Sequence, residues 1–294
     1  MCAKRLSHAA TPSQLRSAIN RIAAERLRAA RPGVPMWDSY PEHVKHAEDV
    51  LVEGLDFAIL RSDFAAGDGN ELEPRTSKGG ARGDVPPKFH AVLSSSALAA
   101  NAFGAFRSDP SALSIAGISG FASLRFERKM PTGVRRAEAN LDVALESSEV
   151  LVGVESKFSE LLAGKEAKFA DGYEAAVAEA KSDPWRKFHG RLVRNPERFS
   201  HLDAAQLVKH FLGLAGAASG RRAVLVYLFW EPTNATRFDV YRRHAEEVER
   251  AVDELGDASI PLVAMRYSEL WDALGSAAPE HAARLQARYA FALA

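Results

Sequence analysis

The chain has 294 residues, of which 47% are hydrophobic, and its 38 lysines and arginines balance its 38 aspartates and glutamates. This length and apolar content allow one large α/β domain, with or without a helical extension, and the balanced charge excludes the general basic excess of small nucleic-acid-binding modules. Cys2 is the only cysteine, which excludes an internal disulfide framework and a thiolate metal cluster.

The sequence lacks the features of a membrane or secreted protein. No run of about 18 apolar residues occurs, and the first residues, MCAKRLSHAATPSQ, are basic without the apolar core of a secretion signal. We therefore expect a cytoplasmic protein that does not contact a membrane.

Two helices are predicted near the N-terminus. Apolar residues recur at helical spacing over 12–31 until RPGVP ends the helix. A second helix is predicted over about 40–60, beginning after a cap at Ser39. Residues 62–87 are rich in Gly, Pro, Asp and Ser and poor in apolar residues, so a mobile loop is predicted there.

Three strands follow a short helix. Residues Ser94 to Ser96 are suited to capping a helix that runs to about Phe106. The segments LRFERKM (124–130), ANLDVALE (139–146) and EVLVGVESKF (149–158) then alternate apolar and polar residues and are joined by short turns. This pattern predicts an antiparallel meander.

The rest of the chain alternates between helices and strands. In order we predict a polar helix over 172–182, a basic connector over 185–199, a helix over 203–219, a strand over 223–230, an amphipathic helix over 236–256, a strand over 259–267 and a helix pair from Ser268. The strand AVLVYLFW is apolar on both faces, which is typical of a strand covered by helices on both sides.

These elements predict an α/β fold with a mixed central sheet, an antiparallel meander plus parallel strands, flanked by helices. We divide the chain into an N-terminal helical extension with its loop, residues 1–84, and a domain over residues 85–294.

Charged residues interrupt the second and third meander strands. Because side chains alternate along a strand, Glu155 and Lys157 share a face with Gly153, and the valines of the same strand face the other way. In the preceding strand the apolar face is predicted to be Leu141, Val143 and Leu145, with Asp142 on the opposite face.

A turn about the Ser148 to Glu149 bond places Asp142 directly across from Glu155, with Cβ atoms about 5 Å apart. Two carboxylates so placed repel unless a positive charge lies between them. Mg²⁺ would resolve this repulsion, with Asp142, Glu155 and the main-chain carbonyl of Ser156 as ligands. Lys157 could then orient or deprotonate water, or stabilise charge on a phosphate. The alternative is a cross-strand salt bridge in which Lys157 neutralises both acids.

Asp142, a twelve-residue gap and Glu155-Ser156-Lys157 resemble the D...(D/E)xK signature of the PD-(D/E)XK nuclease superfamily. The segments FE (126–127), PTG (131–133), NLD (140–142), ESKFSE (155–160) and SSAL (95–98) also resemble an uncharacterised bacterial restriction-endonuclease-like family within it. The motif's proline is absent, since Leu141 precedes Asp142.

This resemblance spans roughly residues 85–270 and implies a restriction-endonuclease-like core. It implies Mg²⁺, with Mn²⁺ able to substitute, and hydrolysis of double-stranded DNA. Asp142 and Glu155 would bind the metal and Lys157 would serve catalysis. Glu127 is an additional candidate acidic ligand, and Gln206, with His210 one turn later, is a candidate for orienting substrate or has a plain surface role.

Basic residues that could contact DNA phosphates concentrate after Asp183: Arg186, Lys187, Arg191 and Arg194. The alternative is a solvated basic loop. A homodimer would suit cleavage of both strands of a duplex. The alternative function is a non-catalytic nucleic-acid-binding or assembly protein that retains the nuclease fold.

Overall fold

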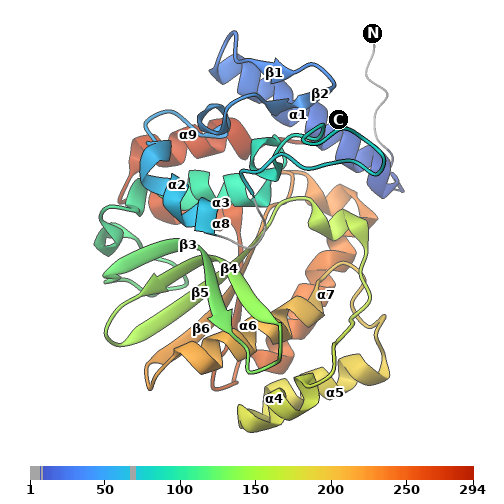
Figure 1. Cartoon of the computed structure of the whole chain (residues 1–294), viewed down its shortest axis with the longest axis vertical. Coiled ribbons are helices and arrows are strands. Elements are labelled where there is room, and N and C mark those ends of the chain that lie inside the picture. The colour runs from blue at the N-terminus through green and yellow to red at the C-terminus, as the bar shows by residue number, and fades with distance from the viewer. Residues whose placement is uncertain (1–6, 8, 67–70) are drawn as a thin grey trace.

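The computed structural model describes residues 7, 9–66 and 71–294, and a five-stranded mixed sheet lies at its centre (Figure 1). The strands follow the order β3, β4, β5, β6, β7. Their bounds are β3 Ser123–Pro131, β4 Glu138–Glu146, β5 Val150–Lys157, β6 Arg222–Phe229 and β7 Leu262–Arg266. The first three pair antiparallel and the last three pair parallel, which confirms the predicted mixed sheet.

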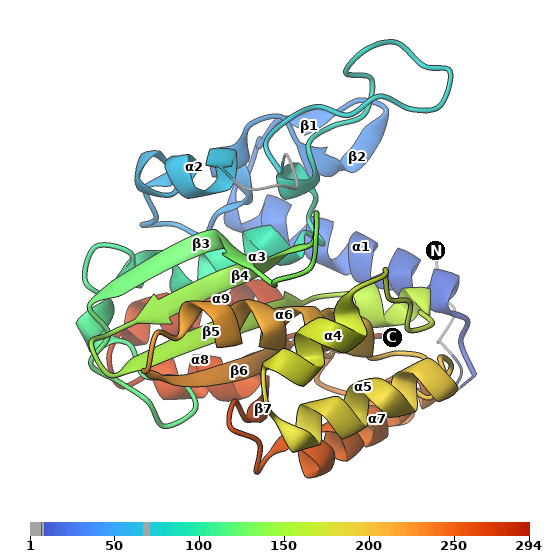
Figure 2. The same cartoon turned by 60° about the horizontal axis from the view of Figure 1, so that its bottom comes forward.

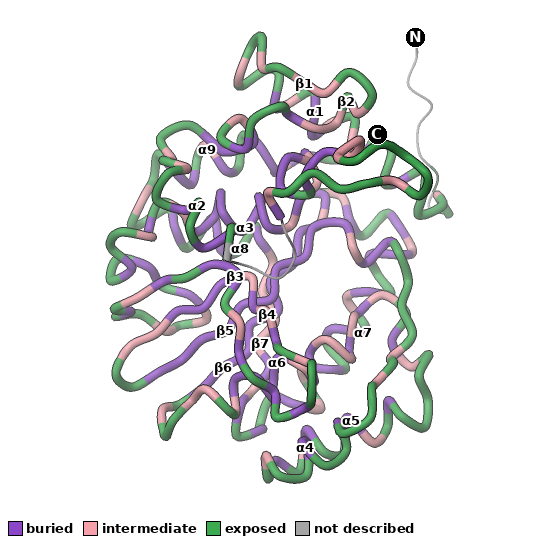
Figure 3. The backbone as a smooth tube through the Cα atoms, in the orientation of Figure 1, coloured by how far each residue is buried: buried purple, intermediate pink, exposed green. Residues whose placement is uncertain are grey.

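Helices cover both faces of this sheet (Figure 2). One face packs against α3 (Ser95–Phe103), α8 (Tyr267–Leu274) and α9 (Pro279–Tyr289). The other face packs against α4 (Tyr173–Glu179), α5 (Asp183–Arg194), α6 (Ala204–Ala217) and α7 (Asp239–Leu255). All eight residues of β5 are buried, and Figure 3 shows the burial concentrated in the strands and on the inner sides of the helices. Among the described residues, none of the helices is long and apolar enough to cross a membrane.

The first predicted helix is confirmed as α1 (Pro12–Ala30). Thr11 and Gln14 form a reciprocal capping box at its start, which satisfies main-chain N–H groups that the helix itself leaves free. Its buried face joins the core under α9. At its N-terminal end the guanidinium of Arg16 donates a 3.2 Å hydrogen bond to the carbonyl of Ser159, just after β5.

The predicted helix over 40–60 is wrong. The chain instead forms a hairpin of β1 (Met36–Trp37) and β2 (Tyr40–Val44), a single turn η1 (Ala47–Val50), and only then helix α2 (Phe57–Ala66). Gly54 has a φ of +90°. A continuous right-handed helix over 40–60 cannot contain this left-handed conformation, which glycine adopts readily. Of the predicted range, only residues 57–60 are α-helical, as the first residues of α2.

The predicted loop over 62–87 begins inside α2, and residues 67–70 of that prediction lie outside the described part of the chain. From 71 to 87 the chain is irregular and is held by a β-bridge between Arg75 and Val85. Further along, the helix predicted from Ser94 is confirmed as α3, with Ser94 as its N-cap.

The predicted basic connector over 185–199 is also wrong for its first part, which is helix α5. Trp185, Phe188 and Leu192 recur at helical spacing and are buried, while Pro184 stands in the first turn, where a proline suits a helix. The many basic residues between these apolar positions favoured the prediction of a connector in place of a helix. The predicted helices that became α1, α3, α4, α6 and α7 are all present.

Residues on both sides of position 84 contribute to one apolar core. Leu15 and Ile19 of α1 and Phe64 of α2 belong to the same cluster as Val152 and Val154 of β5. Phe64 stacks on Phe126 of β3 with ring centroids 5.1 Å apart. The division into 1–84 and 85–294 stays a prediction, and the shared core shows that the two parts pack as one body.

Candidate active site

The hairpin of β4 and β5 has the predicted register up to the point where the charged residues begin. Val143 pairs with Val154, and Leu145 pairs with Val152. The ladder ends before it reaches Asp142 and Glu155. Beyond its last pair, Oδ2 of Asp142 instead accepts a 2.7 Å hydrogen bond from the main-chain N–H of Ser156.

Side chains of β4 switch faces at Asp142. Val143 and Leu145 lie in the core that includes α3, α8 and α9, whereas Leu141 and Ala144 lie in the core that includes α6. Regular alternation would place Leu141 with Val143, so the prediction of one apolar face for the three residues is wrong for Leu141. The irregularity frees the carboxylate of Asp142 to turn toward the backbone of β5.

The same level of β3 is irregular. β3 pairs with β4 on both sides of Glu127, but Glu127 and Asp142 themselves do not pair. Glu127 has a φ of +50°, which is uncommon for a residue with a side chain and is often found at functional sites. Its carboxylate accepts a hydrogen bond from the side-chain amide of Asn140. The break therefore crosses two neighbouring strands and brings two acids to one level of the sheet.

Helix α6 supplies the surroundings of Glu155, which is only 2% exposed. One carboxylate oxygen contacts Nζ of Lys157. The other lies 2.6 Å from Nε2 of the buried His210. Nζ of Lys157 also donates a 2.8 Å hydrogen bond to Oε1 of Gln206. Gln206 and His210, which the sequence marked as one face of a helix, therefore both reach the motif.

Burial and neighbouring charges shift the pKa values of the three acids in different directions. Burial alone would raise the pKa of Glu155, but Lys157 and His210 lower it to about 2. Burial, followed by the negative charges of Glu155 and Glu127, raises the pKa of Asp142 well above its ordinary value. Burial and the charge of Glu71 raise the pKa of Glu127 to about 7. One acid is thus held ionised while two others resist ionisation, as expected for carboxylates that crowd one site.

Burial would lower the pKa of Lys157, but the carboxylates of Glu155, Glu160 and Asp142 raise it above its ordinary value. Lys157 is therefore an ammonium at neutral pH. It can donate hydrogen bonds and stabilise negative charge, but it does not accept a proton in this arrangement.

A family model described as Restriction Endonuclease associating with ARP matches residues 58–290. The chain belongs to this restriction endonuclease family. Neither the curated proteins nor the solved structures include a match to the chain. The matched range contains all five strands of the central sheet and every residue of the candidate site.

The residues that this endonuclease-family chain offers to a metal are oxygen donors. Asp142 and Glu155 supply carboxylates. The N–H of Ser156 points toward β4, where it donates to Asp142. In a strand the N–H and C=O groups of one residue point to the same side, so the carbonyl of Ser156 also faces β4. Among the described residues no group of three or more His, Cys, Asp or Glu is arranged to hold a metal ion. Two carboxylates with one carbonyl fit Mg²⁺, which keeps several waters and takes substrate phosphate oxygens. Glu127, bonded to Asn140, would have to reorient to join them.

Further polar residues around Asp142, Glu155 and Lys157 were not anticipated from the sequence. The hydroxyl of Ser156 lies 2.6 Å from that of Tyr267 on α8. The carboxylate of Glu160 accepts hydrogen bonds from the main-chain N–H groups of Phe158 and Ser159, at 2.7 and 2.9 Å. Glu160 stands in the quoted ESKFSE segment, so its place next to the motif was readable; the contact of Tyr267, more than a hundred residues away, was not.

The four basic residues predicted to contact DNA lie on the exposed face of α5. Arg186 pairs with Asp183 at 2.8 Å, and Arg191 pairs with Glu254 of α7 at 2.7 Å. In the described chain no ion pair involves Lys187 or Arg194. Helix α5 lies on the same side of the sheet as α6 (Figure 2). A role of α5 in DNA contact stays a prediction, and because Arg186 and Arg191 are paired it chiefly concerns Lys187 and Arg194.

Proposed function

We propose that this member of the restriction endonuclease family is a metal-dependent endonuclease of the PD-(D/E)XK type that hydrolyses phosphodiester bonds of double-stranded DNA. The observation that carries the proposal is the meeting of Asp142, Glu155 and Lys157 where the β4–β5 ladder ends. There a strand irregularity aims one carboxylate at the backbone beside the second carboxylate and the lysine.

The proposed roles follow from charge and position. Asp142, Glu155 and the carbonyl of Ser156 would hold Mg²⁺ or Mn²⁺, which when bound supplies a Lewis acid and lowers the pKa of water. The depressed pKa of Glu155 keeps it ionised and ready to bind a cation. Lys157, as an ammonium, would orient the attacking water and stabilise charge on the phosphate. Gln206 would hold Lys157 in place through their hydrogen bond.

A second candidate is a non-catalytic nucleic-acid-binding or assembly protein that retains the fold. The observation that favours it is that both oxygens of the buried Glu155 already contact Lys157 and His210. A metal ion would have to displace or share these contacts. This candidate predicts DNA binding that does not depend on a divalent cation or on Asp142.

Cleavage of supercoiled plasmid distinguishes the two candidates. Wild-type protein with Mg²⁺ or Mn²⁺ should nick or linearise the plasmid, and EDTA, Asp142→Asn or Lys157→Ala should each abolish this. Glu138→Gln, at an exposed position of the same strand as Asp142, is the matched control and should cleave like wild type. A wild-type protein that is inert on varied DNA with both metals would exclude the enzyme. Predominantly linear product, together with a dimeric mass, would support the homodimer.

A further inference from the structure

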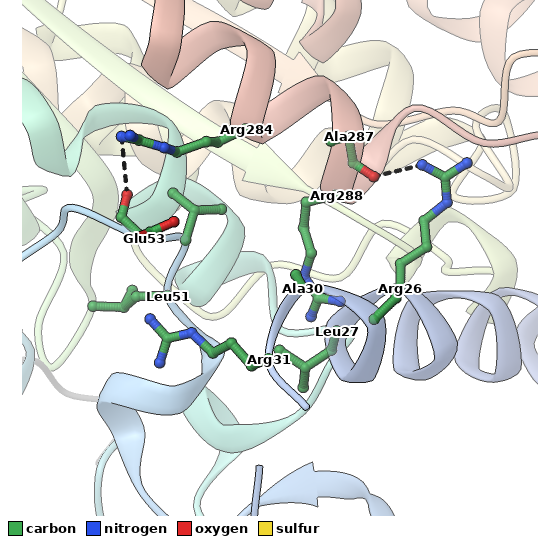
Figure 4. Close-up of a pocket in the computed structure, with 11 residues that line it drawn as sticks. Arg26, Leu27, Ala30, Arg31, Leu51, Glu53, Arg284, Ala287 and Arg288 are labelled. Carbon is green, nitrogen blue, oxygen red and sulfur yellow. Dashed lines mark hydrogen bonds between the residues drawn. The ribbon is translucent and has the colours of Figure 1, made fainter. Parts of the chain in front are cut away.

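A cavity of about 300 Å³ lies between helices α1 and α9, on the N-terminal side of the molecule. This volume is at the lower end of the range for small-molecule sites. Figure 4 shows that the end of α1, the segment around Leu51 and Glu53, and α9 converge on it. Its lining residues are Arg26, Leu27, Ala29, Ala30, Arg31, Leu51, Val52, Glu53, Arg284, Ala287 and Arg288.

Four arginines line this cavity against a single acidic residue, Glu53. Two of the four have carboxylate partners, since Arg31 lies 3.5 Å from Asp49 and Arg284 lies 3.4 Å from Glu280. Within the described parts of the chain, no ion pair involves Arg26 or Arg288. The cavity wall therefore holds two guanidinium groups that no carboxylate neutralises.

Arg288 is the more unusual of the two because it is only 5% exposed. Its Nη1 donates a 2.6 Å hydrogen bond to the carbonyl of Ala23 on α1, while its buried Nη2 has no hydrogen-bond partner among the described residues. Burial lowers the pKa of Arg288, although the neighbouring Tyr289 opposes this, and the charges of Arg31 and Arg26 lower it further. A buried charge is costly unless it is paired, so an anion is the group that would complete this site.

We propose that this cavity binds a small organic anion with a phosphate or carboxylate head and an apolar body. Arginine forks recognise planar or tetrahedral oxyanions through paired hydrogen bonds. The head would accept hydrogen bonds from the nitrogens of Arg26 other than Nη1, since Nη1 already donates to the carbonyl of Ala287. The enclosed positive charge of Arg288, which also lines the cavity, would attract the same head electrostatically. The apolar body would lie against Leu27, Leu51 and Val52. This site is separate from the proposed nuclease centre and does not depend on it.

Isothermal titration calorimetry of the full chain with four small-molecule probes tests the site. Phenyl phosphate and phenylacetate carry a head and a body, inorganic phosphate carries only the head, and benzyl alcohol carries only the body. We expect one of the two complete anions to bind once per chain and more tightly than the head or the body alone. The tighter of the pair identifies the head as phosphate or carboxylate.

Arg26→Gln and Arg288→Gln should each raise the dissociation constant about tenfold or more. Arg26→Gln is less prone to misfolding than Arg288→Gln because Arg26 is less buried than Arg288. Arg21→Gln is the matched control, since Arg21 lies on the same helix, is exposed and pairs with Glu25; its affinity should equal that of wild type. The proposal is overturned if neither complete anion binds, or if one binds wild type and Arg26→Gln equally.

Discussion

Oδ2 of Asp142 and the main-chain N–H of Ser156 are joined by a 2.7 Å hydrogen bond at the level where β4 and β5 stop pairing. The side chain thus takes over the place of a main-chain acceptor. This arrangement fixes the first carboxylate of the motif against the residue between the second carboxylate and the lysine, whatever else occupies the site.

A divalent cation should stabilise the protein, and more so at higher pH. Because the pKa of Asp142 is raised, protons compete with the metal as the pH falls. We expect Mn²⁺ to raise the melting temperature by about 2–4 °C for each kcal/mol of binding, with a larger rise near pH 8 than near pH 5.5. Scanning calorimetry measures this. Asp142→Asn should lose the rise and Glu138→Gln should keep it; an equal rise in both variants would place the metal elsewhere.

Glu127→Gln should make the metal-free protein more stable at neutral pH. The folded-state pKa of Glu127 is raised from 4.5 to about 7. Its stabilising contribution is therefore complete below about pH 4.5 and is lost as the pH rises through about 7. We expect the unfolding free energy of the variant, relative to wild type, to increase by about 1–3 kcal/mol across that window. Urea titrations at several pH values measure it, and a difference that stays flat with pH would contradict the assignment.

Gly153→Ala should be destabilising because Leu141 occupies the space beside it. A Cβ atom at position 153 would lie 2.6 Å from Cδ1 of Leu141 and 3.0 Å from Cδ2 of Leu214. Overpacking of this kind costs about 1–3 kcal/mol. Adding Leu141→Val should recover part of the loss, with a coupling energy of about 1 kcal/mol in a double-mutant cycle. Additive effects would mean that Leu141 does not turn to this face.

On α5, Lys187 and Arg194 should contribute more to DNA binding than Arg186 and Arg191. The latter two already pair with acidic residues. If the unpaired cations contact phosphates, the double variant Lys187→Gln/Arg194→Gln should reduce the slope of log affinity against log salt by about 2. The paired variant Arg186→Gln/Arg191→Gln should change it less. Fluorescence anisotropy with duplex DNA gives both slopes, and identical slopes in all proteins would remove α5 from the interface.

The sequence was sufficient for the sheet and for most of the site's register. Alternating strands and the turn at Ser148 predicted the β4–β5 pairing correctly, because each valine that faces the core fixes its partner. It could not reveal the irregularity at Asp142, since a switch of faces depends on space that Gly153 leaves for Leu141. The surroundings of Glu155 depend on packing of α6 against the sheet, which no local pattern specifies. The hairpin over 36–44 was missed because a serine suited to capping, such as Ser39, occurs in turns as well as at helix starts.

Helix α1 has a practical meaning for work on this family. The family match begins at residue 58, yet Leu15, Ile19 and Leu27 of α1 are fully or almost fully buried, and Arg16 is bonded to the chain just after the motif. A protein trimmed to the matched range would expose an apolar surface that the helix now covers and would loosen the exit of β5. Aggregation or loss of cleavage in such a fragment would therefore result from the loss of core packing by α1, and not from the loss of a catalytic group.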